Sequence, residues 1–260
     1  MAFDFGIEIS AGLVVFLVAC AFVAGFVDSI AGGGGMITIP ALLFAGIPPL
    51  QALGTNKFQS CFGSFGASLH FYKRGHIDLK GSVGFVCVVF LSSMLGSVCV
   101  GLFESDFLRK CIPFLLILFA FYFLFSPKIT QDSSKAILGS AGLGFVLGII
   151  GFYDGFFGPG TGSFFMLSLI TLGGFSLLQA LAHAKLFNFA TNLASMLVFA
   201  FGGHILWIVG LCMALGQFAG ASLGSRVAIG YGVKIIKPLV VCVSLAACVN
   251  LLYKEFFTSL

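Results

Sequence analysis

The sequence has very little charge. Asp, Glu, Lys and Arg together make up 8% of its 260 residues, whereas 59% are hydrophobic, and the mean hydropathy is +1.14. Soluble domains carry about 25% charged residues, because a folded surface has to be solvated by water. The shortage of charge therefore excludes an ordinary soluble domain and indicates an integral membrane protein.

Other absences narrow the class further. The first ten residues contain no Lys or Arg, so we expect the first apolar segment to be a retained helix and not a signal peptide. No basic patch is dense enough to predict a nucleic-acid partner. The eight cysteines lie in or beside apolar segments, and none forms a CxxC pair. Neither a disulfide framework nor a metal site is indicated, and no cofactor is expected.

Long apolar runs are what the chain has instead. About 20 apolar residues cross the hydrocarbon core as a helix, and none of the runs alternates in the manner of a barrel strand. We therefore expect an all-α, polytopic integral membrane protein with about 8–10 helical elements in the bilayer. The runs are Ile9–Val27, Gly81–Phe103, Cys111–Phe125, Ile137–Phe152, Ile208–Leu223 and Pro238–Leu252.

The second half of the chain repeats the first. Four short motifs return in the same order, three of them 128 residues later and one 126 residues later. We predict a first repeat over residues 1–126, a polar cytoplasmic linker over 127–135 and a second repeat over 136–260. The motifs are GFVD at 25 and GFYD at 151, QALGTNK at 51 and QALAHAK at 179, GHI at 75 and 203, and LGS at 95 and 223.

Loop charge predicts that the two repeats are inverted. Cytoplasmic loops collect Lys and Arg, and placing KRGHIDLK, the linker and SRVAIGYGVKIIK inside makes both termini external. Equivalent loops then lie on opposite sides of the membrane. Inverted repeats with broken helices are the architecture of secondary transporters that bind substrate near the midplane. This orientation leaves Arg109, Lys110 and Lys254 outside and puts Lys73, Arg74, Lys80, Lys128, Lys135, Arg226, Lys234 and Lys237 inside.

Four charges fall at membrane depth: Asp28 and Lys57 in the first half, Asp154 and Lys185 in the second. An intramembrane charge is costly and is a functional candidate by default. Two interpretations stay open. In the structural one, each aspartate caps its broken helix and is neutralised by the lysine of its own half. In the functional one, the lysines attract a small anion, and Asp28 and Asp154 carry protons or break the helix.

Polar residues surround both lysines on the predicted helices. Spacings of three and four residues place Ser60 and Ser64 on the face of Lys57, and Asn188 and Asn192 on the face of Lys185. We expect the substrate-binding side chains to be Lys57, Lys185, Asn56, Gln59, Asn188 and Asn192. Of the four histidines, His183 is the candidate for titration during function.

Glycine-rich breaks follow both aspartates, in GGGGM at 32 and GPGTG at 158. A break that opens into a new helix offers backbone N–H groups to an anion. We expect Gly33, Gly34, Gly35, Gly160 and Thr161 to line a cavity there. Whether the short apolar segment Met36–Ile47 spans the membrane or re-enters stays open. The spacing of Gly216, Gly220 and Gly224 predicts a close helix contact.

The stretch GFVDSIAGGGGMITIPALLFAGIPPLQALGTNKFQS, together with GFYDGFFGPGTGSFF and AHAKLFNFATN, closely resembles the TauE/SafE family of sulfite exporters. The resemblance covers essentially the whole chain. It matches the family's Asp- and Gly-rich motif at Asp28 and residues 32–35, and its lysine motif at Asn56, Lys57 and Gln59. In the second half Pro159 and Thr161 interrupt the glycine run, so any site is expected to be asymmetric.

The resemblance implies a transporter of the bacterial inner membrane for sulfite, thiosulfate or an organosulfonate, and not an enzyme. From the residues alone we expect a small anion, transported by alternating access of the two halves within the lipid bilayer. An anion channel is the alternative. A membrane aspartyl protease that uses Asp28 and Asp154 is disfavoured, because its two carboxyl groups must lie within hydrogen-bonding reach. The coupling ion, the direction and a homo-oligomeric state stay open.

Overall fold

The computed structural model describes residues 2–3, 7–8, 10–112, 114–115 and 136–231. The predicted linker 127–135, the predicted span Pro238–Leu252 and most of the predicted span Cys111–Phe125 lie outside the described residues. A two-residue antiparallel hairpin, β1 (Ala2–Phe3) with β2 (Ile7–Glu8), precedes the first helix.

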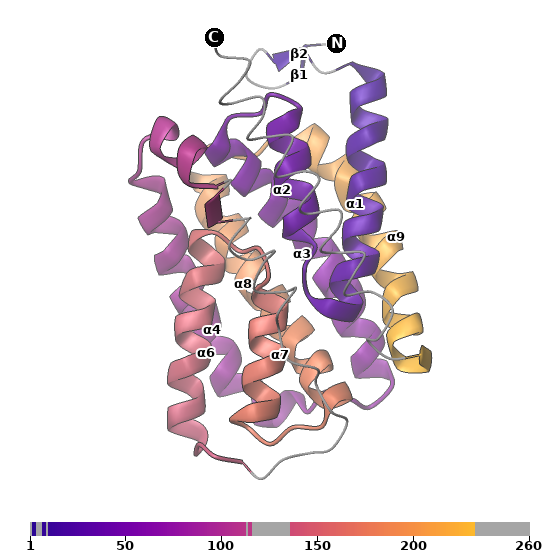
Figure 1. Cartoon of the computed structure of the whole chain (residues 1–260), viewed down its shortest axis with the longest axis vertical. Coiled ribbons are helices and arrows are strands. Elements are labelled where there is room, and N and C mark those ends of the chain that lie inside the picture. Colours follow the sequence, from indigo (N-terminus) through magenta and orange to yellow (C-terminus); the bar gives the residue numbers. More distant parts are fainter. Residues whose placement is uncertain (1, 4–6, 9, 113, 116–135, 232–260) are drawn as a thin grey trace.

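Within the described residues the fold is otherwise helical (Figure 1). Four helices, α1, α4, α8 and α9, are long and apolar enough to cross a membrane, which confirms the multi-pass membrane class. Helix α3 is equally long but more polar, because it carries Lys57 and its polar neighbours. The bounds are α1 Ala11–Ala31, α2 Gly35–Phe44, α3 Pro49–Lys73, α4 Leu79–Gly101, α6 Ser140–Phe156, α7 Thr161–Thr171, α8 Leu177–Phe201 and α9 Trp207–Tyr231.

Two helices break where the glycine runs predicted. Helix α1 ends at Gly32, which has φ 79° in the left-handed region, and α2 then runs back toward the end where α1 began (Figure 1). Helix α6 likewise ends at Phe156, and after a short break α7 runs back toward the end where α6 began (Figure 1). At a rise of 1.5 Å per residue, the 10 residues of α2 extend over about 15 Å, half of a hydrocarbon core. The helix in the segment Met36–Ile47 is therefore too short to span the membrane, which favours re-entry.

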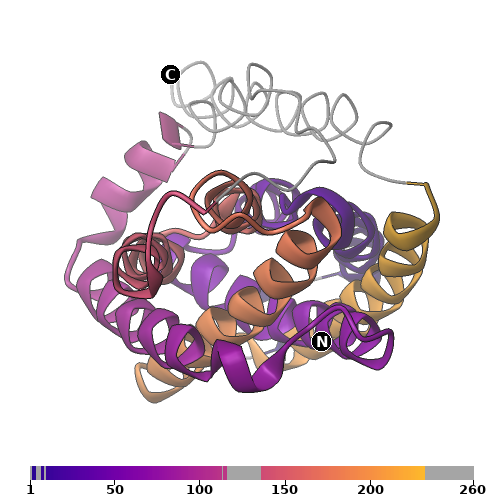
Figure 2. The ribbon, with the colours of Figure 1, turned by 90° about the horizontal axis from the view of Figure 1, so that it is seen from below.

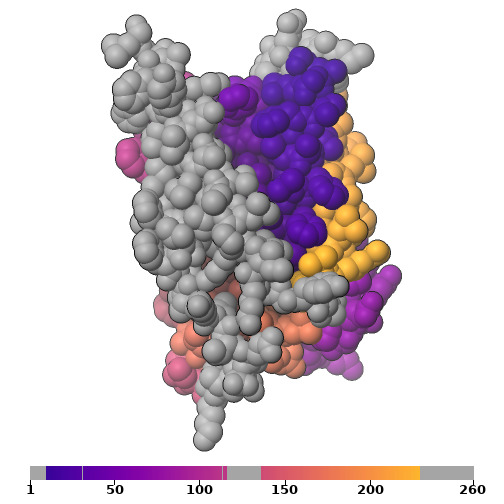
Figure 3. Space-filling model, turned by 45° about the vertical axis from the view of Figure 1, so that its right-hand side comes forward, coloured from indigo at the N-terminus to yellow at the C-terminus, as the bar shows by residue number. Residues whose placement is uncertain are grey.

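The two halves of the chain interlock. Helix α1 packs most extensively against α9, and α4 packs against α6; Figure 2 shows the helices end-on, and Figure 3 shows α1 in indigo beside α9 in yellow. The predicted glycine stripe makes the α1–α9 contact: a Cβ on Gly216, Gly220 or Gly224 would meet backbone carbonyl oxygens of α1. Successive contacts advance in the same direction along both helices, so α1 and α9 are parallel.

Replacing Gly220 with alanine should therefore destabilise the protein, because the new methyl group would overlap the carbonyl oxygen of Phe22. We expect a cost of about 1–3 kcal/mol, typical of overpacking, and a lower Tm in detergent. Gly84 in α4 is the matched control, because a Cβ there meets no atom within 4 Å. Gly84→Ala should be neutral or stabilising, since alanine is the better helix former. An equal Tm for the two variants would contradict this close α1–α9 packing.

Candidate functional site

The two helix breaks meet in the middle of the molecule. A Cβ on Gly32 would lie 2.5 Å from the backbone nitrogen of Ser163, and a Cβ on Gly162 would lie 2.8 Å from Cα of Gly32. Real Cβ atoms do not approach other atoms so closely, so glycine at both positions is what lets the two backbones touch. Gly35 faces Pro159 in the same region, at 3.4 Å from its virtual Cβ to the proline Cα.

Two ion pairs, each with a buried lysine, flank this contact, and each joins one half of the chain to the other. Nζ of Lys57 lies 2.9 Å from Oδ1 of Asp154, and Nζ of Lys185 lies 3.0 Å from Oδ2 of Asp28. The expectation that each aspartate pairs with the lysine of its own half is wrong. Because the breaks interlock, each lysine points into the break of the other half. Both lysines are buried, at 1% and 0% exposure.

The aspartates also hold the breaks in shape. Oδ1 of Asp28 accepts a hydrogen bond from the backbone N–H of Gly34, just before α2, at 3.2 Å. Oδ1 of Asp154 accepts one from the Thr161 hydroxyl, at the start of α7, at 2.9 Å. Nζ of Lys185 donates in addition to the backbone carbonyl of Asp28. Among the described contacts the carboxylates bond to these groups and not to each other, which argues against a diaspartyl protease site.

A small polar cavity lies between the breaks and the two lysine-bearing helices. Its volume is about 30 Å³, room for about two water molecules and less than an oxyanion of four or more heavy atoms requires. Its lining residues are Asp28, Gly32, Gly34, Gly35, Asn56, Lys57, Ser60, Asp154, Gly158, Gly160, Thr161, Gly162, Asn188 and Asn192.

Ten of the predicted site residues thus line one cavity, while four, Lys185, Gln59, Gly33 and His183, are not part of the lining within the described chain. Lys185 nevertheless reaches the cavity edge through Asp28. Sequence reasoning did not assign Ser60 to the site, although its spacing of three from Lys57 was the available signal. Gly32, Gly158 and Gly162 also line the cavity, as expected for members of the two glycine-rich runs predicted to form its walls.

Hydrogen bonds orient the amide side chains around the cavity. Oδ1 of Asn56 accepts from Nε2 of Gln59 at 3.0 Å and from the hydroxyl of Thr38. Gln59 therefore positions Asn56, and the group that Asn56 can offer a ligand is its NH₂ donor. Two buried oxygens that line the site have no hydrogen-bond partner in the structure, Oδ2 of Asp154 and Oδ1 of Asn188. Buried polar atoms are normally satisfied, so these two oxygens are available to a proton or a ligand.

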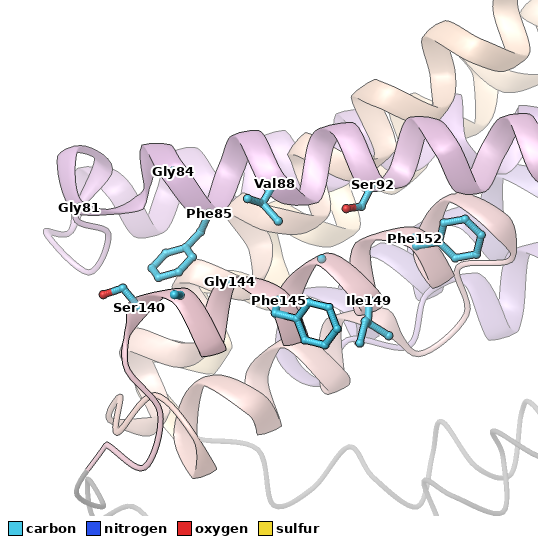
Figure 4. A pocket seen from close by; sticks show the side chains of 12 residues that line it. Gly81, Gly84, Phe85, Val88, Ser92, Ser140, Gly144, Phe145, Ile149 and Phe152 are labelled. Carbon is cyan, nitrogen blue, oxygen red and sulfur yellow. The ribbon is translucent and has the colours of Figure 1, made fainter.

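A larger hollow, of about 760 Å³, lies between α4 and α6 but carries no charge (Figure 4). Its wall is glycine, serine and apolar side chains, among them Phe85, Val88, Phe145 and Ile149. Phe145 and Ile149 are 72% and 56% exposed, so the hollow opens outward, where acyl chains of a bilayer meet the protein. A charged substrate would not be stabilised there. The small charged cavity, and not this groove, is the candidate site for an anion.

Comparison with known proteins agrees with this arrangement. The family model "Sulfite exporter TauE/SafE" matches residues 17–251. A Sinorhizobium protein named "Probable membrane transporter protein ORF9" is 51% identical over 92% of this chain and 92% of its own length. The Escherichia coli K12 protein "Probable membrane transporter protein YfcA" is 44% identical over 92% of this chain and 89% of its own.

A "Probable membrane transporter protein" of Haemophilus influenzae is 43% identical, over 97% of this chain and 98% of its own length. No solved structure matches the chain. These relatives are named as transporters of the membrane, which agrees with the multi-pass helical fold and with buried charges around a central cavity. The family match covers nearly the whole chain. The chain therefore belongs to the TauE/SafE family of membrane transporters.

Proposed function

We propose that the chain is a secondary transporter of a small sulfur-containing anion, such as sulfite, thiosulfate or an organosulfonate, and that it works by alternating access of two inverted repeats. Residues 1–126 and 136–260 would be the repeats and 127–135 the cytoplasmic linker. The helix bounds support this division, because α3 and α8 are both 25 residues long and begin 128 residues apart. The short helices α2 and α7 enter from opposite ends of the molecule (Figure 1).

The observation that carries the proposal is the pair of buried lysines at the contact between two helix breaks. Lys57 and Lys185 would supply positive charge, and Asn56, Asn188 and Asn192 would orient the anion. The backbone at Gly33, Gly34, Gly35 and Gly160, with Thr161, would offer hydrogen bonds at the starts of α2 and α7, where the helix dipole also favours negative charge. Gln59 would act by holding Asn56.

Charge balance at the site favours coupling to protons. The two lysines and two aspartates together carry no net charge, so an anion that enters alone would be a buried charge without a partner, which is strongly unfavourable. Protonation of Asp28 or Asp154 would release its lysine to bind a monoanion and would keep the site neutral, and protonation of both would do the same for a dianion such as thiosulfate. Protons and anion would then move in the same direction, and the gradients would set whether the result is import or export.

Flux into proteoliposomes tests the proposal. We expect saturable uptake of sulfite, thiosulfate or a sulfonate that rises when the outside is made acidic, because each anion enters with a proton. Asp154→Asn should lower the flux about tenfold or more and remove its dependence on the pH gradient, since the amide of asparagine, unlike a carboxylate, does not take up a proton in this assay.

The alternatives have distinct outcomes in this assay. Flux that does not saturate would indicate an anion channel. Flux of carboxylates but of no sulfur anion would contradict the proposed sulfur-containing substrate, while the assignment of the cavity as an anion site would stand. A full response to the pH gradient in both Asp28→Asn and Asp154→Asn would contradict proton coupling through these residues.

A further inference from the structure

Two hydrogen bonds outside the cavity occupy equivalent positions in the two halves. Thr55 in α3 and His183 in α8 are equivalent residues of the repeated motifs QALGTNK and QALAHAK. Oγ1 of Thr55 accepts from the backbone N–H of Leu206, immediately before α9, at 3.0 Å. Nε2 of His183 accepts from the backbone N–H of Asp78, immediately before α4, at 3.3 Å. Each bond joins one half of the chain to the other, and both acceptor side chains are buried.

The two bonds lie at opposite ends of the molecule. Helix α9 is parallel to α1, so Leu206 lies at the end where α1 begins. Helix α4 is parallel to α6, because Val89 contacts Gly151 and Ser93 contacts Gly155, so Asp78 lies at the end where α6 begins. Those two ends are opposite (Figure 1). We call the bonds the Thr55 latch and the His183 latch.

Only one latch contains a titratable acceptor. Nδ1 of His183 lies 2.8 Å from the carbonyl oxygen of Gln179 and must therefore carry a hydrogen, which leaves Nε2 as the acceptor of a neutral ring. A second proton, on Nε2, would face the N–H of Asp78 donor to donor, and the bond would be lost. Threonine keeps its acceptor at any pH between 5 and 8.

The surroundings of His183 are otherwise apolar within the described residues. The rings of Phe175 and Phe187 lie beside it, with centroids 5.1 and 6.4 Å away. Burial among these side chains opposes a charge on the ring, whereas the carbonyl oxygen of Gln179 and the carboxylate of Asp78 favour it. The Asp78 carboxylate also accepts a hydrogen bond from the N–H of Gly81 at 3.1 Å. A protonated His183 would be drawn to this carboxylate and away from the backbone N–H.

We propose that the two latches are the gates of the transport cycle, one at each end, and that acid opens the His183 latch alone. This inference rests on the proposed function, since a gate requires a cavity that opens to each side in turn. Both latches are formed in this structure. Protonation of His183 would release the loop before α4 and open the cavity toward that end, whereas the Thr55 latch would open only through conformational change.

Hydrogen exchange of the purified protein without substrate tests the latches directly. Between pH 7.5 and 5.5, after correction for intrinsic exchange rates, protection of the amides at 77–80 should fall about fivefold or more, while that at 205–208 should not change. The two loops are matched, because His76 and His204 occupy equivalent places in them. His183→Gln should keep the 77–80 amides protected at both values of pH, because the side-chain oxygen of glutamine reaches about as far as Nε2 and accepts at either pH.

The control variant is Thr55→Val, which should lower protection at 205–208 at both pH values and leave 77–80 as in the wild type. Equal pH responses of the two loops, or a pH response at 77–80 that persists in His183→Gln, would overturn the proposal. The measurement requires no flux, so its failure is separate from a failure of the transport function. If the proposed function also holds, His183→Gln should retain saturable flux and shift its dependence on the pH at one face only.

Discussion

Lys57→Met should abolish anion flux, by at least about 100-fold, because it removes a positive charge from the wall of the cavity. The variant also leaves the carboxylate of Asp154 buried without its cation, and breaking one partner of a buried pair typically costs about 3–5 kcal/mol. A loss of flux in the single variant could therefore come from loss of the fold. A second substitution is needed to separate the two effects.

The double variant Lys57→Met with Asp154→Asn makes that separation. It removes both charges of one pair together, and similar neutral replacements of buried pairs are often neutral for stability. We expect a Tm close to that of the wild type and still no flux. Lys73→Met is the matched control: it removes the same charge from an exposed position near the end of α3 and should leave flux unchanged.

The result that would contradict the assignment is wild-type flux in the folded double variant. The ion pair would then be only a structural bond between the halves. Flux lost in the double variant, with binding of sulfite lost in a direct measurement on the same protein, would identify Lys57 as a substrate-binding residue.

Gly32→Ala should have the second largest effect. Its φ of 79° costs an alanine about 1–2 kcal/mol, and the new Cβ would also lie 2.5 Å from the backbone nitrogen of Ser163. The two helix breaks would have to separate, and the cavity between them would lose its shape. We expect flux per folded molecule to fall at least about tenfold, together with a lower Tm.

Gly46→Ala is the control that has the backbone strain without the clash, so comparison with Gly32→Ala isolates the effect of the contact between the breaks. Gly46 has nearly the same backbone angle, φ 81°, but a Cβ there meets no atom within 4 Å. The control should therefore share the strain of the left-handed backbone and keep its flux. If flux and Tm fall equally in the two variants, the contact between the breaks has no role beyond local backbone strain.

Much of the fold could be predicted from local patterns. Apolar runs and the near absence of charge predict membrane helices, because an uncharged segment of this length is stable in hydrocarbon. The breaks at residues 32–34 and 157–160 followed from glycine runs, and the stripe Gly216, Gly220, Gly224 predicted a close helix contact that the structure confirms. Each of these features depends on residues within a single helix or a single break between helices.

The residues of the candidate site could also be chosen from the sequence, but their partners could not. Helical spacing predicted that Asn188 and Asn192 share a face with Lys185, and both line the cavity with Asn56 and Lys57. The pairing of charges was predicted wrongly, because sequence proximity favoured Asp28 with Lys57. In the structure Lys57 reaches Asp154, 97 positions along the chain, and Lys185 reaches Asp28, 157 positions away.

The sequence by itself determined the membrane class, the positions of the breaks and the set of buried polar residues, because each of these is a local property of composition and period. Only the tertiary structure decided that α2 turns back beside α1, that each lysine pairs with an aspartate of the other half, and that Thr55 and His183 accept hydrogen bonds at opposite ends of the molecule. The physical reason is that helix periodicity specifies which residues share a face, whereas the partner of that face depends on how α1 and α6 pack into the opposite halves.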